Sequence, residues 1–220
     1  MIKCCIFDLD GTLLNTISTI THYVNRALGE HLIEGISEEE CKVFVGTGAR
    51  ELIKKALASK NITDSETFDK VFPTYTELYN SAPLYLTEVY DGIPETLSLL
   101  RRQGIKLAVL SNKPDLPTRS VVEKFFPGVF DYVAGAKDGV ALKPSAEGVM
   151  PIFDAFGVSP DECAWIGDTA TDILTGKNAG VALKIGVLWG FRDRAELSEA
   201  GADLIVTEAK EILDGALRVE

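Results

Sequence analysis

The chain has 220 residues, of which 46% are hydrophobic and 25% are charged, and its formal net charge is -11. This length and balance suit one large globular domain or a domain with a sizeable insertion. The negative charge argues against nucleic acids and anionic membranes as partners, because both are negatively charged themselves. No apolar run approaches the ~20 residues of a membrane-spanning helix, and the N-terminus reads directly into a strand without a signal peptide. We therefore expect a cytoplasmic protein.

Four cysteines occur, Cys4, Cys5, Cys41 and Cys163, and they include no C-x-x-C pair. Only two histidines are available to complete a zinc site. We expect the four thiols to be reduced and structural. Cys4 and Cys5 are adjacent, so they should face opposite sides of a strand.

The first expected element is a buried strand at Lys3–Phe7, which is followed by Asp8, Asp10, Gly11 and Thr12. Two acids at the end of a buried strand repel each other and are costly to desolvate unless a cation or a reaction needs them. In open α/β folds, ligands bind at the carboxyl ends of the strands. The segment therefore predicts an acid pair that holds a hard metal ion and acts on phosphate.

The next strand-like run, Lys106–Leu110, comes only after about 95 further residues, whereas a whole βαβ unit needs about 30. This interval carries apolar residues at helical spacing, at Thr16–Leu32, Glu38–Val45, Ala49–Ser59 and Ser65–Tyr79. We therefore predict a helical cap domain, residues 15–85, inserted into a core domain formed by residues 1–14 and 86–220.

Strands and helices alternate through the rest of the chain. Near-continuous apolar runs, typical of strands covered on both faces, lie at Tyr132–Ala134, Ala164–Ile166, Leu183–Leu188 and Asp203–Val206. Helices are expected from Asp91 to Gly104 and at Asp115–Phe126, Ser145–Phe156, Thr169–Ala179 and Glu208–Leu217. This alternation predicts an α/β fold, a Rossmann-like doubly wound parallel sheet.

Polar clusters stand where several of these strands end or the next helix begins. After Asp8 and Asp10 come Ser111-Asn112-Lys113-Pro114, Lys143-Pro144 and the segment Gly167–Asp172. Each cluster alone has a plain structural explanation: a turn, an exposed lysine or a helix N-cap. Because the carboxyl ends of parallel strands share one edge of the sheet, their recurrence predicts a single active site.

The motifs D-x-D-G-T, a hydroxyl residue, a lysine and G-D-x-x-x-D, in this order, resemble those of the haloacid dehalogenase superfamily, over essentially the whole chain. The resemblance implies that Asp8 attacks phosphorus and becomes an aspartyl-phosphate. It implies that Asp10 is first the general acid and then the base, and that Lys143 steadies the nucleophile and the phosphoryl oxygens.

The same resemblance implies a Mg²⁺ cofactor and a phosphate subsite. Expected metal ligands are Asp8, Asp10 through its backbone carbonyl, Asp168 and Asp172, a set of oxygen donors that suits magnesium. Gly11, Thr12, Ser111 and Asn112 are expected to bind the phosphate oxygens. Relatives that cleave carbon–halogen or phosphonate bonds usually replace the second acid, so Asp10 favours phosphate ester or anhydride chemistry.

Two further segments indicate the subtype. Ser111-Asn112-Lys113-Pro114 resembles the T-N-K-P of phosphoglycolate phosphatases, and Val187–Phe191 with Ala200–Asp203 resembles their C-terminal region. Trp189 and Phe191 are equally well explained as core residues. Asn15 and Ala146 depart from that group, which commonly has Asp and Pro there.

The cap contributes a short segment, Val45–Glu51, that resembles the loop closing over the substrate in related phosphatases and mutases. It predicts Thr47, Gly48 and Arg50 as substrate residues, with Arg50 gripping a second anionic group. The alternative is a helix–helix turn with a surface Arg50–Glu51 pair.

Together these features predict a Mg²⁺-dependent phosphatase for a small phosphorylated metabolite, with phosphoglycolate as the leading candidate. A β-phosphoglucomutase-like mutase and an inorganic pyrophosphatase would use the same motifs. A non-enzymatic alternative is a phospho-receiver or Mg²⁺-binding signalling module, but D-x-D and the cap count against it. Both a monomer and a homodimer remain open.

Overall fold

The predicted parallel sheet is present in the computed structural model, which describes residues 1–218. Six parallel strands lie in the order β5-β4-β1-β6-β7-β8. Their bounds are β1 Cys4–Phe7, β4 Lys106–Pro114, β5 Tyr132–Ala136, β6 Cys163–Gly167, β7 Leu183–Val187 and β8 Leu204–Val206. After β1, the chain adds β4 and β5 on one side of it. β6 then pairs with the other side of β1 and is followed by β7 and β8. The site expected at the end of β1 therefore lies where the winding direction changes.

Helices cover both faces of this sheet, which confirms the doubly wound architecture. Cys5 and Phe7 of β1 pack in one hydrophobic core with α5 (Ile93–Arg102), α6 (Asp115–Phe125) and α10 (Lys210–Arg218). Cys4 and Ile6 face the opposite core, with α7 (Met150–Phe156) and α8 (Ala170–Ala179). All four cysteines are buried and free, as expected.

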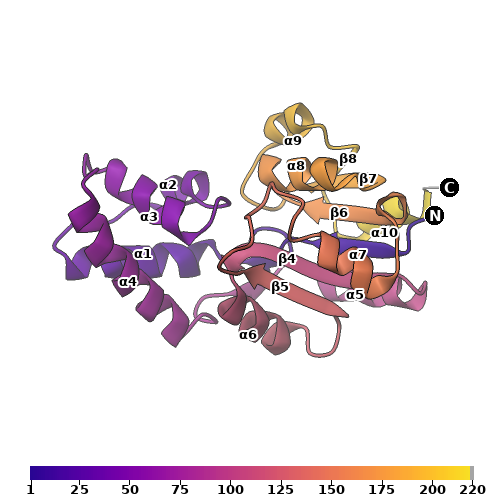
Figure 1. Cartoon of the computed structure of the whole chain (residues 1–220), viewed down its shortest axis with the longest axis horizontal. Coiled ribbons are helices and arrows are strands. Elements are labelled where there is room, and N and C mark those ends of the chain that lie inside the picture. The colour runs from indigo at the N-terminus through magenta and orange to yellow at the C-terminus, as the bar shows by residue number, and fades with distance from the viewer. Residues whose placement is uncertain (219–220) are drawn as a thin grey trace.

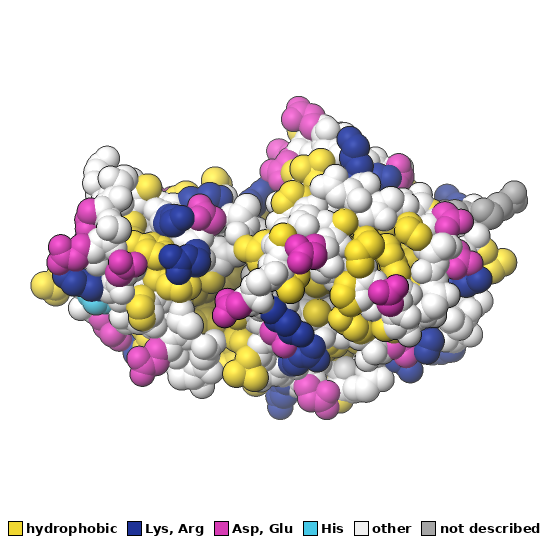
Figure 2. Space-filling view, in the orientation of Figure 1, with side chains coloured by type: hydrophobic (Ala, Val, Ile, Leu, Met, Phe, Trp, Pro, Cys, Tyr) yellow, Lys and Arg dark blue, Asp and Glu magenta, His cyan; other side chains and the backbone are white. Residues whose placement is uncertain are grey.

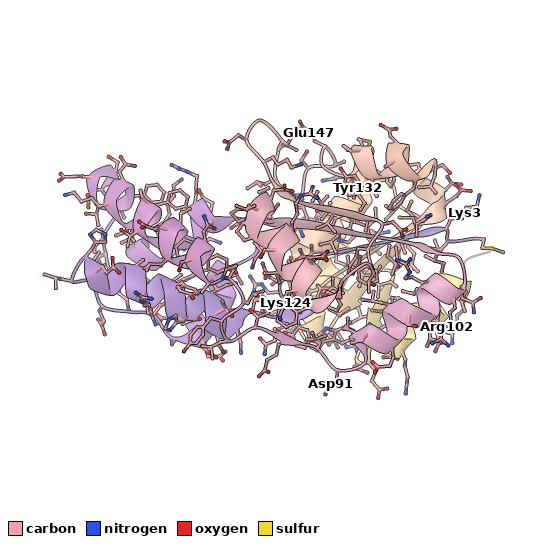
Figure 3. All side chains as sticks on the ribbon, turned by 90° about the horizontal axis from the view of Figure 1, so that it is seen from below. Lys3, Asp91, Arg102, Lys124, Tyr132 and Glu147 are labelled. Carbon is pink, nitrogen blue, oxygen red and sulfur yellow. The ribbon has the colours of Figure 1, made fainter. Side chains whose placement is uncertain are left out.

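Four helices form a second lobe, which lies to one side of the sheet in two perpendicular views (Figures 1 and 3). They are α1 Ile17–Glu30, α2 Glu38–Phe44, α3 Ala49–Ala58 and α4 Ser65–Ser81, and they share a hydrophobic core of their own. The chain enters and leaves this lobe through a two-stranded antiparallel ribbon, β2 (Leu14–Asn15) and β3 (Glu88–Val89). The predicted boundary 14/15 falls within β2, and the predicted boundary 85/86 lies two residues before β3.

One expected helix needs correction, and one helix was not expected. The helix expected at Ser145–Phe156 begins only at Met150. Before it, Ser145 Oγ accepts from the amide of Glu147 and Glu147 Oε2 accepts from the amide of Ala141, so local side-chain bonds replace the first helical turn. A helix α9, Arg194–Ala200, was not expected; the side chain of Asp193 caps it by accepting from the amide of Glu196.

The surface agrees with the composition. Acidic and basic side chains are interspersed over both lobes on the face in Figure 2, without an extended basic patch. Among residues 1–218, no helix has the length and apolarity that crossing a bilayer requires.

Candidate active site

Asp8 lies at the carboxyl end of the central strand and is only 7% exposed. Lys143 Nζ lies 2.8 Å from Asp8 Oδ1 and 2.7 Å from Asp172 Oδ1. Burial lowers the pKa of the Lys143 ammonium, but the charges of Asp172 and Asp8 outweigh it and leave that pKa raised. Lys143 therefore stays a cation between two buried carboxylates.

Asp168 and Asp172 are held rigidly at the end of β6 and the start of α8. Thr12 Oγ1 donates to Asp168 Oδ1 (3.0 Å), and the amide of Phe191 donates to Asp168 Oδ2 (2.9 Å). Asp172 Oδ2 accepts from both the amide (3.1 Å) and the hydroxyl (2.7 Å) of Thr169, in a capping box. These bonds fix both carboxylates before any ligand arrives.

Gly11 allows the chain to pass directly against Asp168. Its φ is +87°, and a Cβ at this position would lie 2.3 Å from Asp168 Oδ2. A side chain here would therefore be strained by the backbone conformation and would also displace the carboxylate. The glycine after Asp10 is needed for this close approach and does more than form a turn.

Three carboxylates form a group that fits a metal ion. One oxygen each from Asp8, Asp168 and Asp172 lies within 4.8 Å of the others, and all three residues are buried. Burial and the charge of Asp172 raise the pKa of Asp8 to about 7. Burial and the charges of Asp172 and Asp8 raise the pKa of Asp168 well above its usual range. Three buried acids share one ammonium, so a hard divalent cation with oxygen ligands would relieve their repulsion.

Asp10 pairs with a second lysine. Lys113 Nζ lies 2.9 Å from Asp10 Oδ1 and 3.3 Å from Asp10 Oδ2. The same ammonium donates to the hydroxyl of Tyr79, which comes from α4 of the cap. Asp10, Lys113 and Tyr79 therefore connect the core to the cap.

Asn112 makes a second connection between the lobes. Its Nδ2 donates to the carbonyls of Gly46 (3.0 Å) and Lys143 (3.1 Å), and its Oδ1 accepts from the amide of Lys143 (2.8 Å). Ser111 is buried beside it. A third connection comes from Arg192, whose guanidinium donates to the carbonyls of Lys42 and Val45 at the end of α2.

A partly open cavity of about 130 Å³ lies between the lobes. Its core side presents Asp8, Asp10, Ser111, Lys113 and Lys143. Its cap side carries no charged residue among the described residues and is largely apolar, with Ile20, Val45, Leu52, Phe72, Tyr75 and Tyr79. Its size suits a small molecule, since pockets for larger ligands run from ~300 Å³ upwards.

Residues 5–185 match the family model of the haloacid dehalogenase-like hydrolases. The chain belongs to this family. A phosphoglycolate phosphatase of Rhodospirillum rubrum is 32% identical, over 92% of this chain and 86% of its own. That of Haemophilus influenzae is 29% identical, over 94% and 95%. A crystal structure of a protein from Lactobacillus delbrueckii subsp. bulgaricus superposes with a TM-score of 0.92 at 31% identity, over 97% and 98% of the two chains.

For this haloacid dehalogenase-like hydrolase, the fold brings the predicted core residues together. Asp8, Asp10, Ser111, Asn112 and Lys143 line the cavity. Asp168 and Asp172 adjoin it through Asp8 and Lys143, and Gly11 and Thr12 contact or bond Asp168. Their catalytic and ligand roles stay predictions.

The three predicted cap residues are placed differently from one another. Gly48 lines the cavity and adopts a φ of +94° before α3. Thr47 does not line it; its Oγ1 lies 3.4 Å from Lys55 Nζ. Arg50 is exposed, with its guanidinium carbon 4.9 Å and 5.0 Å from the ring centroids of Phe68 and Phe72. The structure therefore brings Gly48 to the cavity, whereas Thr47 and Arg50 lie outside its lining.

Sequence reasoning placed Lys113 at the site only as part of the cluster Ser111–Pro114 and gave it no role. It missed Tyr79, which lines the cavity, and Arg192, which joins the lobes. The expected strand ended at Leu110, whereas β4 continues to Pro114 and therefore includes Lys113. Tyr79 continues the apolar spacing of α4 and looks like an ordinary core residue. Trp189 proves to be more than packing, since its Nε1 donates to the carbonyl of Thr12 (2.9 Å) and fixes the segment after Asp10.

Proposed function

We propose that the chain is a Mg²⁺-dependent phosphatase that hydrolyses the phosphate ester of a small metabolite. The observation that carries this proposal is the arrangement around Asp8. Its buried carboxylate lies beside Lys143, Asp168 and Asp172. Asp10, two residues after Asp8 in the chain, supplies a second acid that lines the cavity. Phosphoglycolate is the leading candidate, because the relatives from R. rubrum and H. influenzae carry that name.

In the first step, an ionised oxygen of Asp8 attacks phosphorus and forms the Asp8–phosphorus bond while the bond from phosphorus to the ester oxygen breaks. A protonated Asp10 gives its proton to the departing oxygen, which leaves as an alcohol. Lys143 lies 2.8 Å from Asp8 Oδ1 and stabilises the negative charge on the carboxylate and phosphoryl oxygens.

In the second step, water attacks phosphorus of the aspartyl-phosphate. Asp10, now a carboxylate, takes a proton from this water, and the bond between phosphorus and Asp8 breaks. Inorganic phosphate leaves, Asp8 is again a carboxylate and Asp10 is again protonated. Ser111 and the backbone amide of Asn112 would hold the phosphoryl oxygens in both steps, whereas the amide of Gly11 donates to the carbonyl of Leu14 (2.8 Å).

Asp8, Asp168 and the backbone carbonyl of Asp10 would hold the metal ion. Asp172 adjoins this set and would complete it or orient water around the ion; one of its oxygens accepts from Lys143 and the other from Thr169. The ion supplies positive charge next to the phosphoryl group, where anion attacks anion. The cap would exclude bulk water from the first step through its apolar wall.

The decisive experiment measures phosphate release from phosphoglycolate, p-nitrophenyl phosphate, pyrophosphate and glucose 1-phosphate, with and without Mg²⁺, using Asp8→Asn as the blank. We expect continuous, Mg²⁺-dependent release that is fastest with phosphoglycolate. A mutase would instead interconvert sugar phosphates after priming with a bisphosphate, and a pyrophosphatase would prefer pyrophosphate. A receiver module would stop after one phosphate per chain.

We also propose that the enzyme is cytoplasmic, since its four buried thiols are free.

Gel filtration with light scattering would distinguish the monomer from the homodimer.

A further inference from the structure

We propose that Lys113 binds the carboxylate of the substrate, so that the site selects phosphate esters of 2-hydroxy acids over esters of uncharged alcohols. The inference rests on the proposed phosphatase function and names the residue that gives it substrate specificity.

Few charged residues around the cavity could bind a second anionic group of the substrate. Among the described residues that line it, the cations are Lys113 and Lys143. Lys143 is engaged between Asp8 and Asp172, at 2.8 Å and 2.7 Å, and serves the phosphoryl end. The cap side of the lining is uncharged. A second anionic group of a substrate would therefore find its counter-charge at Lys113.

The position of Lys113 matches the chemistry of such a substrate. In a phosphate ester of a 2-hydroxy acid, the carboxylate is attached to the carbon that carries the ester oxygen. Asp10 must reach that oxygen to protonate it, and Lys113 Nζ lies 2.9 Å from Asp10 Oδ1. The carboxylate would thus come within reach of the Lys113 ammonium. An anion several carbons farther away would instead face the apolar cap wall.

The surroundings of Lys113 increase the value of this contact. Its side chain is only 4% exposed, and an ammonium buried to this degree must be paired. An ammonium has three N–H donors. They point to Asp10 Oδ1 (2.9 Å), Asp10 Oδ2 (3.3 Å) and the Tyr79 hydroxyl, and a substrate carboxylate would replace Oδ2, the more distant of the two Asp10 oxygens. The ring of Tyr79 lies 4.8 Å from Nζ and shields it from water. Charge-assisted hydrogen bonds are strong in such a site.

Tyr79 makes this subsite depend on both lobes. Lys113 belongs to β4 of the core, whereas Tyr79 belongs to α4 of the cap. Arg50, the cation that the cap sequence suggests for the same task, lies over Phe68 and Phe72 and outside the cavity lining. The two lysines of the core therefore divide the substrate between them, with Lys143 at the phosphate and Lys113 at the carboxylate.

The test compares phosphoglycolate with ethyl phosphate, in which a methyl group replaces the carboxylate. The measured quantity is the ratio of the two kcat/KM values in the full-length protein loaded with Mg²⁺. In Lys113→Met we expect this ratio to fall about 30-fold or more, the effect of losing a hydrogen bond to a charged group. If Lys113 acted only through Asp10, kcat/KM would fall by the same factor for both substrates. The ratio would then be unchanged, and this result would overturn the proposal.

Two variants serve as comparisons. Lys55→Met removes a cap lysine that lies outside the cavity lining, and its ratio should stay within about threefold of the wild type. Arg50→Met tests the alternative that Arg50 binds the carboxylate. If the ratio of the two kcat/KM values falls in Arg50→Met but not in Lys113→Met, the proposal is overturned. Because each ratio is taken within one variant, partial unfolding cancels.

The wild type provides a test that needs no variant. It should hydrolyse phosphoglycolate at least tenfold faster, in kcat/KM, than ethyl phosphate; equal values overturn the inference. If p-nitrophenyl phosphate is hydrolysed but the Lys113→Met ratio does not move, only the inference about Lys113 fails. If no phosphate ester is hydrolysed, the phosphatase proposal fails and this inference fails with it.

Discussion

The two lobes contribute opposite kinds of surface to one cavity. The core side is charged and fixed by hydrogen bonds, with Asp168 held through two donors and Asp172 through three. The cap side is uncharged and mostly apolar, and it meets the core through a few polar contacts such as Tyr79 with Lys113. Under the proposed function, the core would supply the chemistry and, through Lys113, the contact to the substrate carboxylate. The cap would cover the site and contribute to selection through Tyr79, which bonds Lys113.

The largest expected effect lies in the core. Asp8→Asn should lower kcat by about 10⁴-fold or more with every phosphate ester, because the amide cannot attack phosphorus. Steady-state phosphate release measures this loss. Asp154→Asn, an exposed acid on α7, is the matched control and should retain the wild-type rate. Substantial turnover by Asp8→Asn would show that the core acid is not the nucleophile.

The acid cluster also predicts how metal binding depends on pH. Burial and the charge of Asp172 raise the pKa of Asp8 to about 7, so a cation must displace a proton below that pH. We expect Mg²⁺ to bind about tenfold more weakly at pH 6 than at pH 8. Titration calorimetry measures this difference, and an affinity independent of pH would contradict it.

The same shift has a consequence for the stability of the metal-free chain. A raised pKa means that the folded chain holds more protons than the unfolded chain between pH ~4 and pH 7. Stability should therefore be greater at the acid end of this window and decline as the pH rises through it. The melting temperature should fall between pH 5 and pH 7 without metal, and this fall should be smaller in Asp8→Asn.

A smaller effect is expected where the lobes are joined. Arg192→Met removes the donors to the carbonyls of Lys42 and Val45, so the closed arrangement should weaken by about 1–2 kcal/mol. We expect KM to rise up to about tenfold with a lesser change in kcat. Arg194→Met removes an exposed neighbour on α9 and should match the wild type in both constants. A loss confined to kcat would argue against a role in closure.

The smallest expected effect belongs to the cap. Tyr79→Phe keeps the ring over Lys113 but removes the hydroxyl, which should lower kcat/KM for phosphoglycolate about threefold to tenfold. The decrease with p-nitrophenyl phosphate should be smaller. Equal losses with both substrates would assign Tyr79 to the common chemistry and erase the contrast between the lobes.

Much of the core was predictable because its signals are local. Buried parallel strands read as apolar runs, and polar residues directly after them must lie at one edge of the sheet. Asp8, Asp10 and Asp168 could therefore be assigned to one site from the sequence, whereas Lys143 precedes an expected helix and its role came from the family resemblance. Gly157 and Gly180 directly follow two of the expected helices, and both adopt the left-handed conformation that glycine favours there, with φ of 63° and 73°.

The features that the sequence did not predict depend on contacts between distant segments, or on side-chain hydrogen bonds that compete locally with helix formation. The pairing of Lys113 with Asp10 and Tyr79 joins three elements of two lobes, and no periodicity encodes it. Arg50 has the right chemistry for an anion, yet its guanidinium stacks on two phenylalanines of α4. The late start of α7 depends on hydrogen bonds made by Ser145 and Glu147, which helix-forming patterns do not register.

The chain has two tryptophans, and both are attached to the site. Trp189 donates to the carbonyl of Thr12, two residues after Asp10, and the ring of Trp165 lies 5.6 Å from Lys143 Nζ. Indole fluorescence responds to nearby charge, so a cation among the carboxylates and an anion beside Lys143 should each change the emission. The protein thus carries its own optical reporters, and the order in which metal and substrate arrive can be followed by stopped-flow without attaching a dye.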